Sequence, residues 1–204
     1  MQIKRQPVDE CVQYISDLLD ESYADLPTSI RVKGEYGRID KAINRALKAK
    51  LLLMAASPLF NGNPDYANFK DEEGNPYFNL VEDATKWEKA AEAAKQASDD
   101  ATNASHDLFY FDQSMSGFKL SETSLIQMSI RHAVCERWNK EIVWGLSDSR
   151  ATTMQNYCMP RLTNEMTLTL CYAALAPTLK IAQQFYTKNG VPIEEDKTLD
   201  FSTI

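Results

Sequence analysis

Glycine is scarce in this chain of 204 residues, with 7 occurrences, whereas alanine occurs 21 times. Alanine is the strongest helix former and glycine is a poor one, so this balance favours helix over sheet. Long apolar runs are also missing. The run Leu51–Ala56 falls far short of the ~20 residues that a membrane-spanning helix needs. We therefore expect a mainly α-helical protein without a transmembrane helix.

Positive charge is in deficit, because 22 Lys and Arg residues face 29 Asp and Glu residues, a net charge of −7. Nucleic-acid binding needs a cationic surface, so a nucleic-acid partner is not expected. The composition is 44% hydrophobic and 25% charged. That share of apolar residues excludes a mainly disordered chain, and the length is sufficient to bury a core without disulfide bonds.

Short cysteine spacings are absent as well. The four cysteines are Cys11, Cys135, Cys158 and Cys171, and no pair has the C-x-x-C spacing of a zinc or redox site. Free thiols are the expected state, and a Cys158–Cys171 disulfide stays open for an oxidising compartment.

The segment Met1–Pro7 has no apolar core, so it is not expected to be a signal peptide.

Three segments in the first half have the apolar periodicity of helices: 8–26, 40–56 and 84–102. Pro7 suits the first turn of the first helix, and Pro58 ends the second. Because Leu51–Ala56 is apolar on all sides, we expect the last turns of the second helix to be deeply buried.

One face of the third helix carries small residues and a tryptophan. Trp87 is expected to be largely buried there against the helix that ends at Ala56. The spacing within Trp87–Ala94 and Ala49–Ala56 reproduces that of the two helices of a tetratricopeptide repeat. Two unrelated amphipathic helices are the alternative. The residues of this face are Ala84, Trp87, Ala91, Ala94 and Ala101.

The second half is less regular. Ser121 is a candidate cap for a fourth helix, residues 141–145 are expected to form a short strand, and residues 146–176 show the least regularity. A fifth helix is predicted to begin at Pro177–Thr178, and Asn189–Gly190 to close it with a left-handed cap.

Catalytic and metal-binding motifs are lacking. The only histidines, His106 and His132, have no partner at zinc-site spacing. Asp71, Glu73 and Asn75 suggest a calcium loop, but Pro76 stands where such a loop needs glycine, so a solvated turn around a small hairpin is favoured. No nucleophile, base and orienting group can be assembled from local spacing. We expect no enzymatic activity, no cofactor and no metal.

Aromatic residues gather in and beside the irregular segment: Trp138, Trp144, Tyr157 and Tyr172. Aromatic faces stack on the apolar C–H face of sugar rings, while amide and guanidinium groups bond the hydroxyls. Aromatic packing in the core is the alternative. Because loops on a rigid scaffold carry binding sites, we predict a ligand site within residues 144–172. Its candidate residues are Trp144, Asn156, Tyr157, Arg161 and Tyr172.

Several short segments of the sequence resemble segments of a known protein family. The run from Ala46 to Gly62, which contains Ala-Ser-Pro-Leu-Phe-Asn-Gly, is similar to the signature of the RagB/SusD family of outer-membrane glycan-binding lipoproteins of certain Gram-negative gut bacteria. Segments 87–95, 138–144 and 176–193 resemble later family segments in the same order. The family fold is a superhelix of antiparallel, tetratricopeptide-like helix pairs with irregular loops and one or two short strands.

Two departures accompany the resemblance. Gln183 stands where the family usually has an acidic residue. Family members are also well over twice this length and open with a lipoprotein signal and a lipidated cysteine. The chain is therefore expected to be a central part of one family domain. Tetratricopeptide-like helices would occupy 1–110, and mixed helix and loop 111–204.

The resemblance implies a non-enzymatic protein at the surface of the outer membrane. Such a protein captures oligosaccharides and delivers them to a SusC-type TonB-dependent transporter. It further implies that part of the ligand site lies outside this chain, so this chain alone should bind glycan weakly or not at all. A generic helical-repeat adaptor that binds a protein segment is the alternative function.

Overall fold

The computed structural model describes residues 4–30, 32–146, 151–160, 172 and 174–198. It divides into two compact units, Met1–Ser147 and Asp148–Ile204. In the described residues β pairing is limited to two isolated bridges, Lys70–Pro76 and Tyr186–Pro192. The prediction of a mainly α fold is thus confirmed. The helices are α1 (Val8–Tyr23), α2 (Lys41–Ala56), α3 (Thr85–Asn103), α4 (Glu122–Cys135), α5 (Ala151–Cys158) and α6 (Leu179–Ala182), with short 3₁₀ turns at Lys33–Glu35, Pro64–Tyr66, Gln113–Met115 and Ile193–Glu195.

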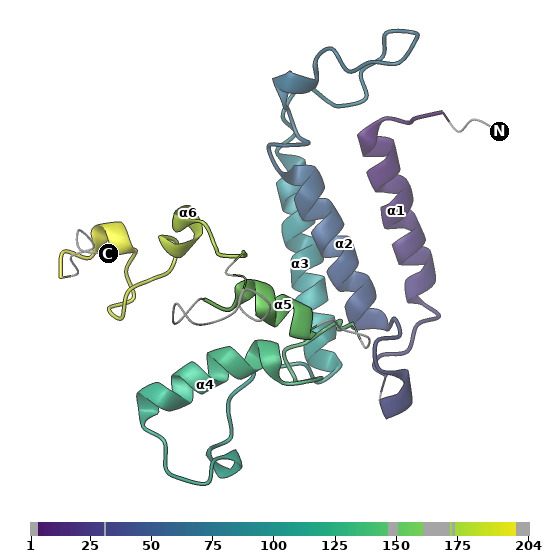
Figure 1. Ribbon diagram of the computed structural model, residues 1–204. Coiled ribbons are helices and arrows are strands. Elements are labelled where there is room, and N and C mark those ends of the chain that lie inside the picture. Colours follow the sequence, from purple (N-terminus) through teal and green to yellow (C-terminus); the bar gives the residue numbers. More distant parts are fainter. Residues whose placement is uncertain (1–3, 31, 147–150, 161–171, 173, 199–204) are drawn as a thin grey trace. The chain divides into compact units, whose positions relative to one another are not determined.

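The first unit is built on α1, α2 and α3, which lie side by side and run in alternating directions (Figure 1). The N-terminal end of α2 is capped by Asp40, whose side chain accepts a hydrogen bond from Ile43 N at 3.0 Å. The helix ends at Ser57, the residue before Pro58, as the sequence predicts. All three predicted helices are confirmed, each within a few residues of its expected ends.

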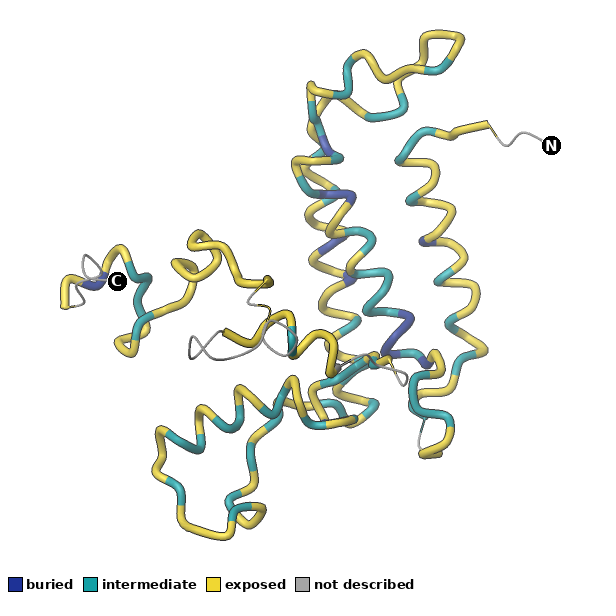
Figure 2. The backbone as a smooth tube through the Cα atoms, viewed as in Figure 1, coloured by how far each residue is buried: buried dark blue, intermediate teal, exposed yellow. Residues whose placement is uncertain are grey.

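The interface between α2 and α3 is made of small side chains, and it holds the most buried positions in Figure 2. Small residues let two helix backbones approach closely, which excludes water without bulky side chains. This interface is the core of the first unit. Its buried apolar residues are Ala42, Ile43, Ala55 and Ala56 of α2 and Ala90 and Ala93 of α3.

The predicted orientation of α3 is wrong. Trp87 is 43% exposed, and Ala91 and Ala94 are exposed as well, whereas Ala90 and Ala93 face α2. Alanines stand at so many positions of α3 that several of its faces are equally small. The face that packs is the one without the bulky indole, because Trp87 in the interface would hold the two helices apart.

The predicted burial at the end of α2 is half correct. Ala55 and Ala56 are buried, but Leu53 is 54% exposed and Met54 is 52% exposed. Helices α1 and α3 cover only part of the surface of α2, so an all-apolar turn must leave some of its side chains uncovered.

The segment between α2 and α3 is anchored to the start of α3 by a reciprocal pair of hydrogen bonds. Asn61 Nδ2 donates to the Asp83 carbonyl, and Asp83 N donates to Asn61 Oδ1, both at 2.9 Å. Gly62 has a φ of +77°, and a Cβ there would lie 2.7 Å from Glu82 N. The chain therefore bends at Asn61–Gly62, and only glycine fits position 62 without strain. The hairpin turn is also present, closed by Asp71 and Asn75.

The C-terminal part of the first unit contains α4, which the Ser121 side chain caps as predicted. The predicted strand at 141–145 is wrong, because this segment consists of turns and bends. Trp138 has a left-handed backbone with a φ of +53°, and Ile142 N bonds back to the Asn139 carbonyl at 3.2 Å. This local turn takes the backbone out of the extended conformation, and no described strand lies beside it to pair.

The second unit contains α5, α6 and a turn that ends near Asp196. The predicted fifth helix is wrong in length, because α6 ends at Ala182. Gly190 has the expected left-handed φ of +73°. It does not close a helix but a tight turn, in which Thr187 N donates to Val191 O.

Hydrogen bonds from Thr187 and Thr198 hold the pKa of the buried Asp196 carboxyl well below its usual range.

Helices long and apolar enough to cross a membrane are not found in the described part of the chain. Cys11, Cys135 and Cys158 are exposed free thiols. Cys171 lies outside the described residues, and Cys158, its candidate partner, is a free thiol.

Candidate functional site

Two of the predicted site residues form an aromatic pair in the second unit. The ring centroids of Tyr157 and Tyr172 are 5.1 Å apart with an angle of 34° between the ring planes. Both side chains are substantially exposed, Tyr157 at 40% and Tyr172 at 44%. Two adjacent, accessible rings offer an apolar surface with two hydroxyl groups, which suits a ligand with both apolar faces and polar groups.

The end of α5 holds this pair together through its backbone. The last carbonyls of a helix have no partner within the helix. In α5, the Asn156 carbonyl accepts a hydrogen bond from Tyr172 N at 2.8 Å, and the Tyr157 carbonyl accepts from Ala174 N at 2.9 Å. These bonds fix the register of the returning segment against the helix. They place Tyr172 beside Tyr157, so Asn156 contributes through its backbone carbonyl.

Trp144 belongs to the first unit and is held by a different contact. Its indole N–H donates to the Gly37 carbonyl at 3.1 Å, and its side chain is 52% exposed. The predicted site residues therefore fall in two units: Asn156, Tyr157 and Tyr172 in the second, and Trp144 in the first. Arg161 lies outside the described residues.

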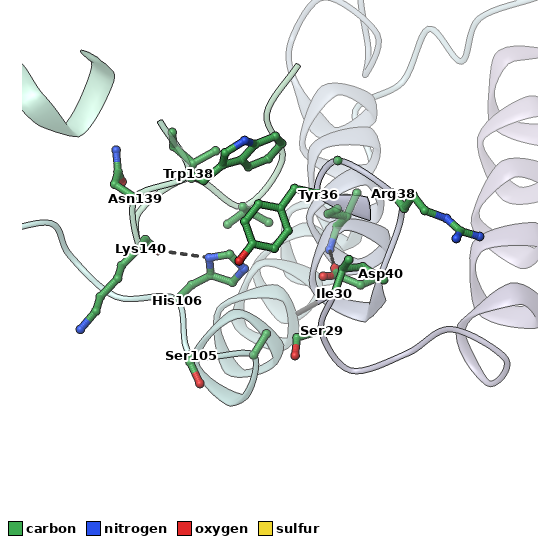
Figure 3. Close-up of a pocket in the computed structure, with 15 residues that line it drawn as sticks. Ser29, Ile30, Tyr36, Arg38, Asp40, Ser105, His106, Trp138, Asn139 and Lys140 are labelled. Carbon is green, nitrogen blue, oxygen red and sulfur yellow. Dashed lines mark hydrogen bonds between the residues drawn. The ribbon is translucent and has the colours of Figure 1, made fainter. Parts of the chain in front are cut away.

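The first unit also contains a pocket of about 410 Å³ that the sequence did not predict (Figure 3). Three separate segments line it: the loop that precedes α2, the end of α3, and the turn that follows α4. Sequence spacing could not have found it, because the three segments are far apart in the chain. More than sixty residues separate the loop before α2 and the start of α2 from the end of α3, and more than thirty separate the end of α3 from the turn after α4. The lining residues with rings or polar groups include Ser29, Tyr36, Asp40, His106, Trp138 and Asn139. We refer to this cavity as the Trp138 pocket.

Hydrogen bonds join two of the segments that form the Trp138 pocket. The Lys140 carbonyl accepts from Asp107 N at 3.1 Å and lies 3.1 Å from His106 Nδ1. The Asn139 side chain donates to the carbonyls of Ala133 and Glu136, at 2.9 and 3.0 Å, and so caps the end of α4. The pocket wall is therefore built on fixed backbone.

Metal-ligating side chains are not clustered in the described part of either region. Among the described residues, no group of three or more His, Cys, Asp and Glu side chains is placed to hold a metal ion. The one carboxylate in the Trp138 pocket, Asp40, accepts the backbone N–H of Ile43 as a helix cap. Both regions place aromatic rings beside hydrogen-bonding groups, an arrangement that suits a ligand with apolar faces and polar groups.

Comparison with known proteins finds solved structures that match this chain. No protein-family model matches the chain, and no curated protein matches it. A solved structure of the Bacteroides thetaiotaomicron protein BT4246 matches with a TM-score of 0.78 and 32% sequence identity, over 98% of this chain. The selenomethionine form of BT4246 matches with a TM-score of 0.76 and 31% identity. This chain spans 37% of the length of BT4246. The fold described above is therefore similar to part of an experimentally observed fold.

Proposed function

We propose that this chain is part of a non-enzymatic glycan-binding protein of the RagB/SusD family, and that it captures oligosaccharides at the cell surface. The observation that carries the proposal is the pairing of Tyr157 with Tyr172, two exposed rings at 5.1 Å on a backbone fixed by the end of α5. A sugar ring stacks its C–H face on such a surface, and the tyrosine hydroxyls bond its hydroxyl groups.

Two further observations support the family. The string that resembles the family signature ends at Asn61–Gly62, and both residues have a structural role there that other residues would not fill. The similarity to BT4246 extends over 98% of this chain, with 32% sequence identity. The fold by itself does not define a function, so the ligand site carries the argument.

The proposal extends to a partner and a location. In the family that the sequence resembles, a SusC-type TonB-dependent transporter in the outer membrane receives the captured oligosaccharide. We place this protein on the outer-membrane surface for the same reason. The helices of the first unit would provide the scaffold and part of the contact with the transporter.

A helical-repeat adaptor is the second candidate, and one feature of α4 favours it. Ile126, Ile130 and Val134 are spaced by four residues and are 56%, 70% and 85% exposed. They form an apolar stripe along one face of the helix, which is how helical surfaces engage protein segments. An adaptor of this kind would bind protein and show no affinity for glycans.

Saturation-transfer NMR with a panel of neutral oligosaccharides tests the proposal and tolerates weak binding. Malto-, cello-, xylo- and manno-oligosaccharides are suitable probes. At least one should receive saturation from the protein. Tyr157→Ala and Tyr172→Ala should each weaken its binding by about 1–3 kcal/mol, the scale of stacking on an aromatic side chain.

Tyr14→Ala is the matched control, because Tyr14 is 65% exposed on α1 and belongs to neither candidate region. It should leave glycan binding unchanged. Equal binding in all three variants would make Tyr157 and Tyr172 packing residues and move the site elsewhere. Binding of a protein partner with no response to any glycan would favour the adaptor, and hydrolysis of a bound glycan that survives repurification would contradict a non-enzymatic role.

A further inference from the structure

The Trp138 pocket is lined by residues with an unusual, left-handed backbone conformation. Only two described residues other than glycine have a positive φ, Ser105 at +71° and Trp138 at +53°, and both line this pocket. The left-handed conformation is costly for a residue with a Cβ, and most costly for a bulky one. Such residues concentrate at functional sites, where the surrounding structure holds them in place.

The indole of Trp138 is held in one position. A Cβ at Gly145 would lie 3.1 Å from Trp138 Cζ3, and one at Gly37 would lie 3.4 Å from Trp138 Cη2. The Tyr36 ring lies on another side, with its centroid 5.3 Å from that of Trp138 and an angle of 59° between the planes. Two glycines and a tyrosine therefore fix the ring, and Figure 3 shows Tyr36 and Trp138 next to one another at the pocket.

The hydrogen-bonding role of His106 Nδ1 follows from its neighbour. His106 Nδ1 lies 3.1 Å from the Lys140 carbonyl oxygen, which can only accept a hydrogen bond. Nδ1 must therefore carry the proton, and in the neutral ring Nε2 is an acceptor. In Figure 3 the second ring nitrogen faces away from Lys140, on the side of Tyr36. The pocket thus presents an acceptor at His106 and a hydroxyl at Tyr36.

The charged residues at the pocket are directed elsewhere. The Arg38 guanidinium pairs with Glu35 at 2.6 Å, and the Arg38 and Lys140 side chains point away from the interior in Figure 3. Asp40 is occupied by the backbone N–H of Ile43. A phosphate or a carboxylate would find no cation to pair with, and a metal would find too few ligands. The interior suits an uncharged ligand that carries hydroxyl groups.

We propose that the Trp138 pocket is a second carbohydrate site, which binds one neutral sugar unit or a disaccharide. The volume of about 410 Å³ lies within the usual range of small-molecule sites. The fixed rings of Tyr36 and Trp138 supply the apolar surface, and the Tyr36 hydroxyl and His106 Nε2 bond the sugar hydroxyls. The choice of a sugar as the ligand rests on the proposed function. The uncharged interior of the pocket, with its aromatic and polar groups, is observed independently of that function.

Fluorine NMR of the full chain labelled with 5-fluorotryptophan tests the proposal. The chain has three tryptophans, so single Trp→Phe variants assign the three resonances. Maltose, cellobiose, xylobiose and mannobiose are titrated in turn. We expect the Trp138 resonance to shift saturably with at least one of them, and the resonance of Trp87, on α3, to stay in place.

Tyr36→Phe removes one hydroxyl and keeps the ring, so it should weaken this titration roughly two- to tenfold, the effect of one hydrogen bond. Tyr14→Phe, the same change on α1, should have no effect. A Trp138 resonance that moves with none of the four disaccharides overturns the proposal. A shift that Tyr36→Phe leaves unchanged also overturns it, because the ligand then lies outside the pocket.

Tyr172→Ala separates this proposal from the proposed function. A Trp138 shift that persists in Tyr172→Ala supports a site that works without the tyrosine pair. Glycan binding that Tyr172→Ala abolishes, with Trp138 unmoved in the unsubstituted protein, leaves the proposed function standing and overturns the second site. Absence of any response in both NMR experiments contradicts both proposals.

Discussion

The hydroxyl of Tyr23, in the last turn of α1, donates a hydrogen bond of 2.7 Å to Asp100 Oδ2 of α3, 77 residues away. Two cations of α2 lie over the same ring, Lys41 Nζ at 4.9 Å and Arg45 Cζ at 4.0 Å from its centroid. One side chain therefore contacts all three helices of the first unit. This contact is one of several that attach α1, together with the ion pairs of Asp20 with Arg45 and Lys48.

Tyr23→Phe should lower the free energy of unfolding by about 0.5–1.5 kcal/mol, because it removes one hydrogen bond and keeps the ring under the two cations. Urea denaturation followed by circular dichroism measures the difference. Tyr14→Phe is the matched control, since Tyr14 lies on the same helix and is 65% exposed. An equal loss in both variants would mean that the bond to Asp100 has no specific role.

The same bond predicts a dependence on alkaline pH. Donation to Asp100 raises the pKa of Tyr23 above its usual 10.0. The folded protein then holds the phenol proton more tightly than the unfolded chain does. The stabilisation is therefore complete below about pH 10 and is lost as the pH rises through the folded-state pKa. The stability difference between the unsubstituted protein and Tyr23→Phe should shrink over that range. A difference that stays constant well above pH 10 would contradict the assignment.

A pair of alanines tests the corrected orientation of α3. Ala90 is buried against α2, and Ala91, the next residue, is exposed. Ala90→Leu should destabilise the first unit by about 1–3 kcal/mol through overpacking, whereas Ala91→Leu should change stability by less than about 0.5 kcal/mol. Thermal unfolding of the two variants gives the comparison. The reverse order would restore the face predicted from the sequence, with Trp87 toward α2.

A structural feature could be predicted from the sequence when it depends on residues that are close together in the chain. Helix ends were predictable because a cap such as Ser121 or a stop such as Pro58 acts within a few residues. The buried face of α3 was not, because its alanines occupy several faces and only packing against α2 decides among them. The strand expected at 141–145 failed because the left-handed backbone of Trp138 has no sequence signal of the kind that glycine gives.

The candidate ligand sites were also hard to predict, because they depend on contacts between residues that are far apart in the chain. The tyrosines at 157 and 172 could be named from their residue type, but their pairing depends on backbone bonds between α5 and a later segment. The Trp138 pocket joins three segments that no spacing connects. Gly37 and Gly145 were the nearest signal, because both make room for the Trp138 ring, yet their partner is evident only in three dimensions.

Two glycines with left-handed backbones separate the cost of a close contact from the cost of conformation. Gly62 has a φ of +77° and a Cβ there would lie 2.7 Å from Glu82 N, whereas Gly74 has a φ of +89° and nothing within 4 Å of that position. Gly74→Ala should cost only the left-handed strain, about 1–2 kcal/mol. Gly62→Ala should cost roughly 1–3 kcal/mol more, because the methyl group must displace backbone of the segment that Asn61 anchors. Urea denaturation of the two variants measures the difference. Equal losses would show that the backbone at Glu82 yields freely, and that the glycine in the family-like string serves its turn alone.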